Sequence, residues 1–497
     1  YFLSMNSRLR LNQRGPNVVQ PRSRLGPGAP TIKKNILRPI SSKTVQNTAS
    51  VENETETQPI SDFPSPPVQI VSCHRTQQGE MPMIPNIGTA PHGEISILVI
   101  QKLKLCQRSC DFSDPRADAG GKATKRATLN ELIDLYTNPK MLPKLTRECH
   151  QQLIEMFAIN IFRPPPSVPR ALMVSDEVTI EDTAWPHLQL IYLLFLKFLD
   201  CGVEQRILQF QLSPKFISNL FSILDFPDER ERTQVRSVIA SIYKQVPPQR
   251  TLLINITINL LMNVPEDLEI NAASHLLELF YLFTSDAPLP LSQQLINAFD
   301  HVLLPLHLTF RCKRYFEPLV KCILSMIRKD ARLGNNLLQF LIGHWPLTLD
   351  HKSELFINEI SQVIDDINTV DLQQNIKSLL ERITIAAESP CTTLADKALK
   401  FLSNNTIQNM IVENAEPLLA ILFPPLFRIT CGHWQKTLQL AALKEMNCLM
   451  ELVPEEFKAA AETYKENSLY EKARKMRKKN LWEDVAKVAA KNFNTID

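Results

Sequence analysis

A run of apolar residues at 185–199 constrains the fold more than any other part of the sequence. It reads Trp-Pro-His-Leu-Gln-Leu-Ile-Tyr-Leu-Leu-Phe-Leu-Lys-Phe-Leu. Pro186 stands where a first helical turn accepts proline, and Glu181 and Asp182 place negative charge nearby, so the run predicts a helix. Apolar side chains cover nearly every face of this helix, and the run is too short to cross a bilayer. The helix must therefore be covered by other protein on most sides.

Helical periodicity continues through most of the chain. Only 12 of the 497 residues are glycine, whereas phosphate-binding loops, βα loops and tight hairpins depend on glycine. From residue 95 onward, leucine-rich segments of helical period follow one another, with prolines in the breaks; they include 186–201, 228–246, 249–263, 269–284, 291–304 and 455–490. Neighbouring helices pair into a repeat of about 40 residues, the range of HEAT and armadillo repeats. Because one pair cannot bury its own apolar face, we predict an all-α solenoid of stacked pairs.

Composition divides the chain into three predicted segments: a basic tail rich in Pro, Ser, Thr and Gln over 1–93, the HEAT-like solenoid over 94–454, and a C-terminal basic helix and tail over 455–497. The first segment has few aromatic residues and cannot bury enough apolar surface to offset chain entropy, so we expect disorder there. A mitochondrial transit peptide is the alternative. Glycines and prolines between residues 15 and 30 argue against it, because they would interrupt the amphipathic helix of such a signal.

Charge is distributed unevenly. Residues 1–50 carry nine Lys or Arg and no acid, so removing this +9 from the total of +3 leaves −6 for residues 51–497. Six of the eight residues at 472–479 are basic as well, inside the last predicted helix. A solvated terminal helix is the simplest interpretation of that cluster, and a nuclear import signal or a contact with an acidic partner is the alternative.

The sequence offers no constellation for catalysis or for a cofactor. Gly121 and Lys122 resemble the end of a phosphate loop, but Ala123 stands at the Ser/Thr position. The pair Cys106 and Cys110 lacks the further ligands of a zinc site. We therefore predict no catalytic residue, no cofactor and no metal site.

Other candidate groups also favour structural roles. His301 and His307 are expected at a helix end or in the core, and adjacent Asp365 and Asp366 would point apart on a helix, so they cannot share a proton. The ten cysteines show no pairing pattern, and the sequence shows no secretory signal or membrane span, so we expect a reducing compartment, the cytoplasm or the nucleus. An acidic body without interleaved basic and aromatic residues argues against nucleic acid. What remains is a protein-binding surface.

The ordered set of motifs resembles the B-prime family of regulatory subunits of protein phosphatase 2A. The helix at 185–199 looks like a hallmark of that family, and the similarity covers roughly residues 95–490 without a large gap. Further matching stretches are 100–106, 111–115, 125–129, 157–163, 228–232 with 242–243, 303–307, 345–348, 356–359, 398–399, 404–405, 433–437 and 445–447.

The resemblance implies a curved, superhelical solenoid that docks on the phosphatase scaffold subunit and catalytic subunit. Its concave, partly acidic surface would face the catalytic subunit, and a separate groove would capture phosphoprotein substrates or adaptors. In the family that groove receives a short disordered motif that contains Leu, Ile and Glu. An apolar pocket takes the aliphatic side chains and basic residues pair with the Glu.

Four residues of this chain stand at matching positions of the groove. Tyr243 and Arg250 agree with the family, and Leu279 and Phe283 replace its isoleucines. A structural role is the alternative for the first two, in which the tyrosine packs between helices and the arginine caps carbonyls after the Pro247-Pro248 break. Trp185, Trp345 and Trp434 are expected in the core between repeats rather than in a recognition surface.

The remaining polar positions of the groove depart from the family. Ala240 and Ser241 stand in place of adjacent His and Arg, and Ser292 and Leu295 stand in place of Lys and His. Hydrogen bonds to charged groups contribute about 1.5 to 3 kcal/mol each, so losing two weakens binding roughly a hundredfold or more. We therefore expect the family's motif to bind this chain poorly.

Three classes of function follow in order of support. The first is a non-catalytic targeting subunit of a Ser/Thr phosphatase holoenzyme with a divergent substrate groove. The second is a solenoid interaction scaffold that has lost phosphatase docking. The third is an enzyme, which no nucleophile, base or metal constellation supports.

Overall fold

The computed structural model describes residues 67–70, 82–91, 93–114, 116–166, 168, 179–265 and 271–493. They belong to one compact unit, residues 63–497. Most of the predicted tail at 1–93 lies outside the described residues, and so does the end at 494–497. The described part is helical almost throughout, which confirms the predicted all-α fold.

The helices follow one another with short connections. In chain order they are α1 (Ile95–Cys106), α2 (Ala119–Thr137), α3 (Arg147–Ile161), α5 (Trp185–Asp200), α6 (Gln205–Gln211), α7 (Pro214–Ile223), α8 (Glu229–Gln245), α9 (Arg250–Asn263), α10 (Ala273–Asp286), α11 (Gln293–Ala298), α12 (Leu304–Leu306), α13 (Cys312–Ile327), α14 (Arg332–Gly343), α15 (Asp350–Val363), α16 (Thr369–Ala387), α17 (Thr392–Leu402), α18 (Asn405–Glu413), α19 (Ala415–Gly432), α20 (Lys436–Leu452) and α21 (Pro454–Phe493). Short 3-10 turns lie at Ile87–Thr89, Leu142–Lys144, Pro247–Gln249 and Ile364–Asp366.

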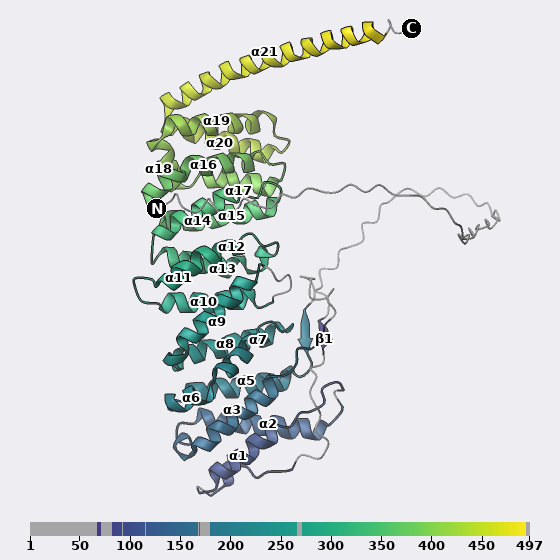
Figure 1. The fold of residues 1–497 in the computed structure, drawn as a ribbon, viewed down its shortest axis with the longest axis vertical. Helices are drawn as coiled ribbons and strands as arrows, with labels where there is room; N and C mark the ends of the chain where they lie inside the picture. Colours follow the sequence, from purple (N-terminus) through teal and green to yellow (C-terminus); the bar gives the residue numbers. More distant parts are fainter. Residues whose placement is uncertain are drawn as a thin grey trace, which may run out of the picture. The chain divides into compact units, whose positions relative to one another are not determined.

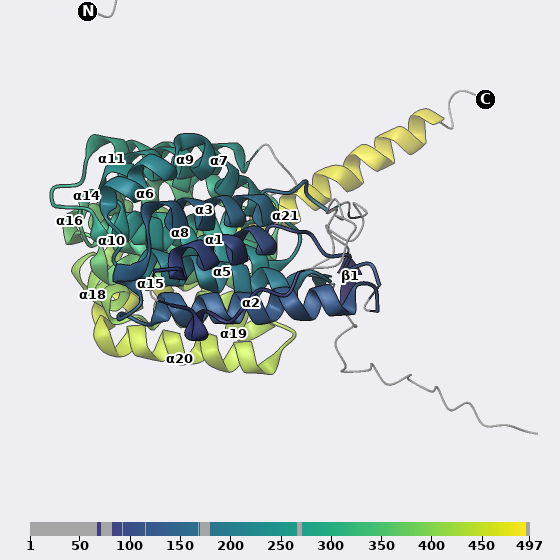
Figure 2. The same ribbon diagram turned by 90° about the horizontal axis from the view of Figure 1, so that it is seen from below.

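Most of these helices form two layers that run through the unit (Figure 1; Figure 2 shows the same helices from below). In one layer α2, α5, α8, α10, α13, α15, α17 and α20 each contact the next. In the other, α1 contacts α3, α7 contacts α9, and α14, α16, α19 and α21 pack in succession. Helices of the first layer from α8 onward begin about 40 residues apart, as the predicted repeat requires.

Helix α5 is enclosed as its sequence demands. It packs against α2, α3 and α8. Tyr192, Phe195 and Phe198 are fully buried, and the ring of Phe195 stacks on that of Phe157 in α3 with a centroid distance of 3.9 Å. Only a narrow strip of α5, which includes Leu193, reaches the surface. The prediction that this helix is covered on most sides is confirmed.

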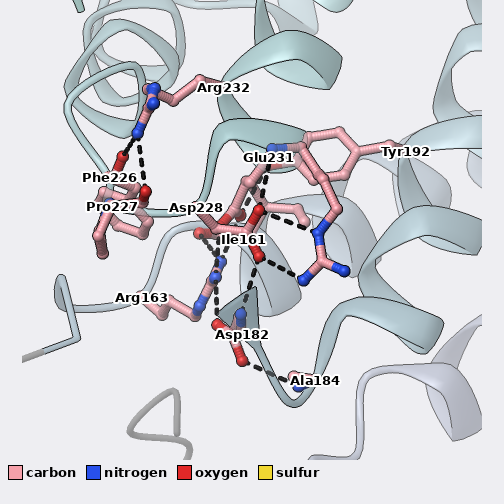
Figure 3. A network of polar contacts seen from close by, with 11 residues as sticks. Ile161, Arg163, Asp182, Ala184, Tyr192, Phe226, Pro227, Asp228, Glu231 and Arg232 are labelled. Atoms are coloured by element: carbon pink, nitrogen blue, oxygen red, sulfur yellow. Dashed lines mark hydrogen bonds and ion pairs between the residues drawn. The ribbon is translucent and has the colours of Figure 1, made fainter. Parts of the chain in front are cut away.

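A buried ionic network joins α5 to its neighbours (Figure 3). Arg163 follows α3 and donates two hydrogen bonds to Glu231 of α8, at 2.7 and 2.6 Å. It also donates to Asp182 at 3.1 Å, and the Tyr192 hydroxyl donates to Glu231 at 2.9 Å. Burial lowers the pKa of Arg163, but the hydrogen bonds and charge of Glu231 outweigh burial and hold that pKa above its usual value. The guanidinium therefore stays charged inside the core.

Several short features were not predicted from the sequence, α6 among them. Strand β1 (Val68–Ile70) pairs in parallel with β2 (Ile180–Asp182), with Val68 opposite Ile180. The single helix predicted over 291–304 is instead α11, the π-helical turn η4 (Phe299–Leu303) and α12. Three-residue strands carry too little alternation to be recognised from sequence.

Helix α19 is the one helix of the described part that is long and apolar enough to cross a membrane by length and composition. It packs against α16, α20 and α21, and its buried side chains include Leu419, Leu422 and Leu426. A core helix of a helical stack meets the same criterion. Its neighbour α21 packs on it through Phe457 and Tyr464, whose rings lie 5.2 and 5.7 Å from that of Phe423.

Candidate functional site

A groove of about 260 Å³ opens between α8, α9, α10 and the loop that leads to α11. These three helices contact one another in consecutive repeats of the stack (Figure 1). The groove is lined by both apolar and polar side chains; the full lining is Tyr243, Arg250, Thr251, Ile254, Phe283, Asp286, Ala287, Pro288, Pro290, Ser292, Gln294 and Leu295. It therefore offers an apolar surface beside a few charged and polar groups, as binding sites for peptides commonly do.

The Pro247-Pro248 break brings Tyr243 and Arg250 together. Two prolines have no N–H to donate, so α8 ends at Gln245 and the chain turns into α9. This turn lets Arg250 Nε donate to the Tyr243 carbonyl at 2.9 Å, with the guanidinium 4.8 Å from the centre of the tyrosine ring. The structural alternative for Arg250 is thus observed, since it does cap a carbonyl at the end of α8, yet the same side chain also lines the groove.

Helix α10 supplies the opposite wall. The ring of Phe283 lies 4.5 Å from that of Tyr243, so the two form a continuous aromatic surface. Leu279 comes from the preceding turn, is buried in the core and is not part of the lining. Of the four residues predicted to form the groove, the structure therefore brings three together and places Leu279 behind them.

Asp286, the last residue of α10, is a groove residue that sequence reasoning missed. The Tyr243 hydroxyl donates to its Oδ2 at 3.3 Å, and Arg250 Nη1 lies 3.5 Å from the same oxygen. Burial raises the pKa of Tyr243, and the negative charge of Asp286 raises it further. One sequence signal was available, because Asp286 follows Phe283 by three residues and so shares its helix face.

Two of the four positions that depart from the family lie in the lining of the groove, and two do not. Ser292 and Leu295 line it, whereas Ala240 packs against the core and is not in the lining. Ser241 donates to Asp200 of α5 at 3.4 Å. No basic side chain other than Arg250 is among the described lining residues. The groove is therefore poorer in positive charge than the family's site is expected to be.

Lys329, which follows α13, fixes the end of the groove. Its ammonium donates to the carbonyls of Thr284, Ser285 and Ala287 at 2.6, 2.8 and 2.7 Å. The last carbonyls of a helix have no partner within the helix, so a cation that binds them stabilises its carboxyl end. The next repeat thus holds Asp286 in place.

A second group of candidate residues consists of exposed apolar side chains in loops between helices. Phe310, Leu347 and Trp434 are 80, 65 and 72 % exposed, and they lie between α12 and α13, α14 and α15, and α19 and α20. The expectation that Trp434 is a core residue is therefore wrong, because its loop turns the indole toward solvent beside His433. Exposed apolar side chains are a feature of interaction surfaces when they gather in one patch.

The other two tryptophans behave differently. Trp345 is buried edge-on against Phe356 with a centroid distance of 5.9 Å, which confirms its predicted place in the core. Trp185 is half-buried beneath Arg230, whose guanidinium lies 5.2 Å from the ring. Its prediction as a core residue is only partly confirmed.

The histidine and cysteine candidates have structural surroundings. His307 is fully buried and contacts Glu359 at 2.9 Å, as a core histidine would, whereas His301 is exposed in η4. Burial raises the pKa of the Cys106 thiol to about 12, so this thiol stays protonated. Within the described ranges no group of three or more His, Cys, Asp or Glu is placed to hold a metal ion.

Comparison with known proteins identifies the family. The family model of the protein phosphatase 2A regulatory B subunit (B56 family) matches residues 84–489. The chain is 28 % identical over 418 residues to the 56 kDa regulatory subunit alpha isoform of Serine/threonine-protein phosphatase 2A from Mus musculus, with 83 % of this chain and 85 % of that protein covered.

Relatives in other organisms agree. The regulatory subunit pptr-1 of Caenorhabditis elegans is 32 % identical over 392 residues, which covers 78 % of this chain and 72 % of that protein. The B' eta isoform of the 59 kDa regulatory subunit from Arabidopsis thaliana is 30 % identical, with 77 % and 76 % covered. The resemblance found in the sequence is confirmed: the chain belongs to the B56 family of protein phosphatase 2A regulatory subunits, and it is a regulatory rather than a catalytic subunit.

Proposed function

We propose that this chain docks on the scaffold and catalytic subunits of protein phosphatase 2A and directs the enzyme to selected phosphoproteins. The observation that carries this proposal is the extent of the family match, which runs from before α1 to within α21. The catalytic partner would perform hydrolysis, and this chain would raise the local concentration of chosen substrates or adaptors near it.

The exposed apolar loops are the docking surface that we favour. Phe310, Leu347 and Trp434 come from loops that link the two layers in separate repeats. Covering such side chains removes apolar surface from water, the main favourable term in association. A partner that runs along the stack can contact all three loops.

Co-purification from cells tests docking. We expect phosphatase scaffold and catalytic subunits to elute with the full chain, and we expect the triple variant F310D, L347D and W434D to lose them. M262D is the matched control, because Met262 is a similarly exposed apolar residue on α9. If the unsubstituted chain elutes alone, the chain is a scaffold that has lost phosphatase docking, and the proposal fails.

The groove beside Tyr243 is the proposed site for substrates or adaptors, with altered specificity. Ser241 and Ser292 stand where the family's groove has basic residues, so an acidic side chain of a peptide has fewer hydrogen-bond partners here. We expect a fluorescent peptide of the family's Leu/Ile/Glu motif to bind with a Kd weaker than about 100 μM in a polarisation assay. A Kd of a few micromolar or below would show that the family's specificity is retained.

We also propose that the chain acts in the cytoplasm or in the nucleus. Nine cysteines in the described part are free thiols, in line with a reducing compartment. The basic cluster at 472–479 lies on the exposed part of α21, where an import receptor could reach it. Fluorescence imaging of the tagged chain and of a variant with these lysines and arginines changed to Gln tests the nuclear alternative, which requires that the variant be excluded from the nucleus.

A further inference from the structure

Asp286 contacts both of the other polar groups at one end of the groove, Tyr243 and Arg250. Among the described residues of the lining, it supplies the one negative charge and Arg250 supplies the one positive charge. Its Oδ2 meets both the Tyr243 hydroxyl, at 3.3 Å, and the Arg250 guanidinium, at 3.5 Å. The two polar groups that could receive an acidic side chain from a peptide therefore already face a carboxylate that belongs to the protein.

The Arg250 guanidinium is already partly engaged within the protein. Its Nε donates to the Tyr243 carbonyl, its guanidinium lies over the Tyr243 ring, and Nη1 faces Asp286. An incoming carboxylate would have to share this guanidinium with Asp286 while it is repelled by the same aspartate at close range. Acidic side chains are thus disfavoured at this end of the groove.

Asp286 itself retains binding capacity. The Asp286 side chain is 52 % exposed, compared with 38 % for Arg250. Both of its contacts are longer than the 2.7 to 2.9 Å or so of strong charge-assisted hydrogen bonds, and a carboxylate can accept about four hydrogen bonds. A cationic side chain that enters from solvent can therefore pair with it without displacing a strong interaction.

We propose that the groove binds a short extended peptide that lays aliphatic side chains against Ile254, Phe283 and Leu295 and pairs a Lys or Arg side chain with Asp286. Charge complementarity selects this occupant over a peptide with an acidic residue at the same place. The proposal rests on the proposed role of the groove as a substrate site and names the class of peptide that the site takes.

Fluorescence polarisation with the full chain and three labelled peptides tests this specificity. The peptides share the Leu and Ile of the family's motif and differ only at its Glu, which is kept or changed to Gln or Lys. Because exposed charge pairs contribute up to about 1 kcal/mol, exchanging repulsion for attraction should make the Lys peptide bind roughly fivefold or more tightly than the Glu peptide. D286N should abolish or reverse that preference.

D396N is the matched control, because Asp396 of α17 forms an exposed ion pair with Lys400 far along the chain from the groove. It should leave all three affinities unchanged, and melting curves should show that both variants are folded. The proposal is overturned if the unsubstituted chain prefers the Glu peptide, if D286N keeps the preference for Lys, or if no peptide binds at millimolar concentration.

Co-purification of the scaffold and catalytic subunits with D286N separates the two proposals. Retained co-purification with a lost preference for Lys locates specificity at Asp286 within an assembled phosphatase. A chain that fails to co-purify but still prefers the Lys peptide contradicts the docking proposal and leaves the peptide proposal standing.

Discussion

Some charged side chains of this protein are buried in the core, where each needs a partner of opposite charge. The Arg163 guanidinium is almost fully buried, and the carboxylates of Asp182 and Glu231 are its partners. Arg163 and Glu231 belong to motifs that identify the family in the sequence, but the sequence did not reveal that they pair, because 68 residues separate them. Charge within a family motif can therefore serve the fold rather than a ligand.

Arg163→Met tests the ionic network. The substitution leaves two buried carboxylates without their cation, which is expected to destabilise the fold by about 3 to 5 kcal/mol. Chemical denaturation followed by circular dichroism measures the loss. R328M is the control, because Arg328 pairs with Asp366 at the surface and its loss should cost about 1 kcal/mol or less. Equal effects of the two variants would contradict the structural role of the network.

His275 makes stability depend on pH. Burial lowers its pKa, but the contact with Glu229 at 3.1 Å and the nearby Glu278 carboxylate, 3.5 Å away, outweigh burial and raise the pKa above the usual 6.5. The hydrogen bond from His275 likewise lowers the pKa of Glu229 from 4.5 to about 2. The contribution of His275 to the free energy of unfolding is therefore full below pH 6.5 and is lost as pH rises through the raised pKa. The contribution of Glu229 is full above pH 4.5 and is lost as pH falls toward 2.

His275→Gln should accordingly lower the melting temperature more at about pH 5.5 than at about pH 8.5. Glutamine cannot carry the positive charge with which protonated His275 of α10 pairs with Glu229 of α8. Thermal melts at both pH values measure the difference. H301Q provides a comparison at an exposed histidine and should show no such dependence. A decrease of the same size at both pH values would mean that His275 acts through packing alone.

Individual helices were largely predictable, and their exceptions have physical causes. The apolar run of α5 indicated both its type and its burial, since a helix that is apolar on nearly every face must be covered by protein on several sides. Trp434 was assigned to the core because a large aromatic side chain usually is buried, but the short loop between α19 and α20 leaves its indole outside the packed layers. Asp286 escaped prediction because its role depends on α8 and α9, which only the packed structure brings to it.

Phe195→Ala tests the enclosure of α5. Deleting a fully buried ring that stacks on Phe157 should cost about 3 to 5 kcal/mol, from lost burial and the cavity left behind. Leu193→Ala on the exposed strip of the same helix should cost less than about 1 kcal/mol. Denaturation midpoints measure both, and a mild effect of F195A would show that this part of the core repacks freely.

At the scale of the whole molecule, stability depends on contacts between neighbouring helices of each layer. The first turns of α21 cover α19 through Phe457 and Tyr464, whereas side chains from residue 469 to residue 490 are exposed. Terminal elements of a helical stack are needed where they cover the last repeat and dispensable beyond it. The sequence predicted the stack and its repeat length, but the point where α21 leaves the stack follows from packing.

Truncated chains test where α21 ceases to cover the stack. A chain that ends at Asn467 should keep the melting temperature within about 2 °C of the full chain, because the removed residues cover no apolar core. A chain that ends at Val453 should melt earlier and aggregate, since Phe423 and Phe427 of α19 lose their cover. Differential scanning fluorimetry and light scattering distinguish the two. Similar melting of both truncations would contradict the capping role of the first turns of α21.

The three hydrogen bonds from Lys329 to the end of α10 have a mechanical consequence. They tie the α10 wall of the groove to the end of α13 in the next repeat, while Tyr243 and Arg250 on the other wall belong to the preceding repeat. Bending of the stack between these repeats is therefore expected to change the distance from Asp286 to Arg250. A partner that bent the stack on assembly would therefore change the affinity of the groove for a peptide. By the same coupling, a bound peptide would change the affinity of the chain for that partner.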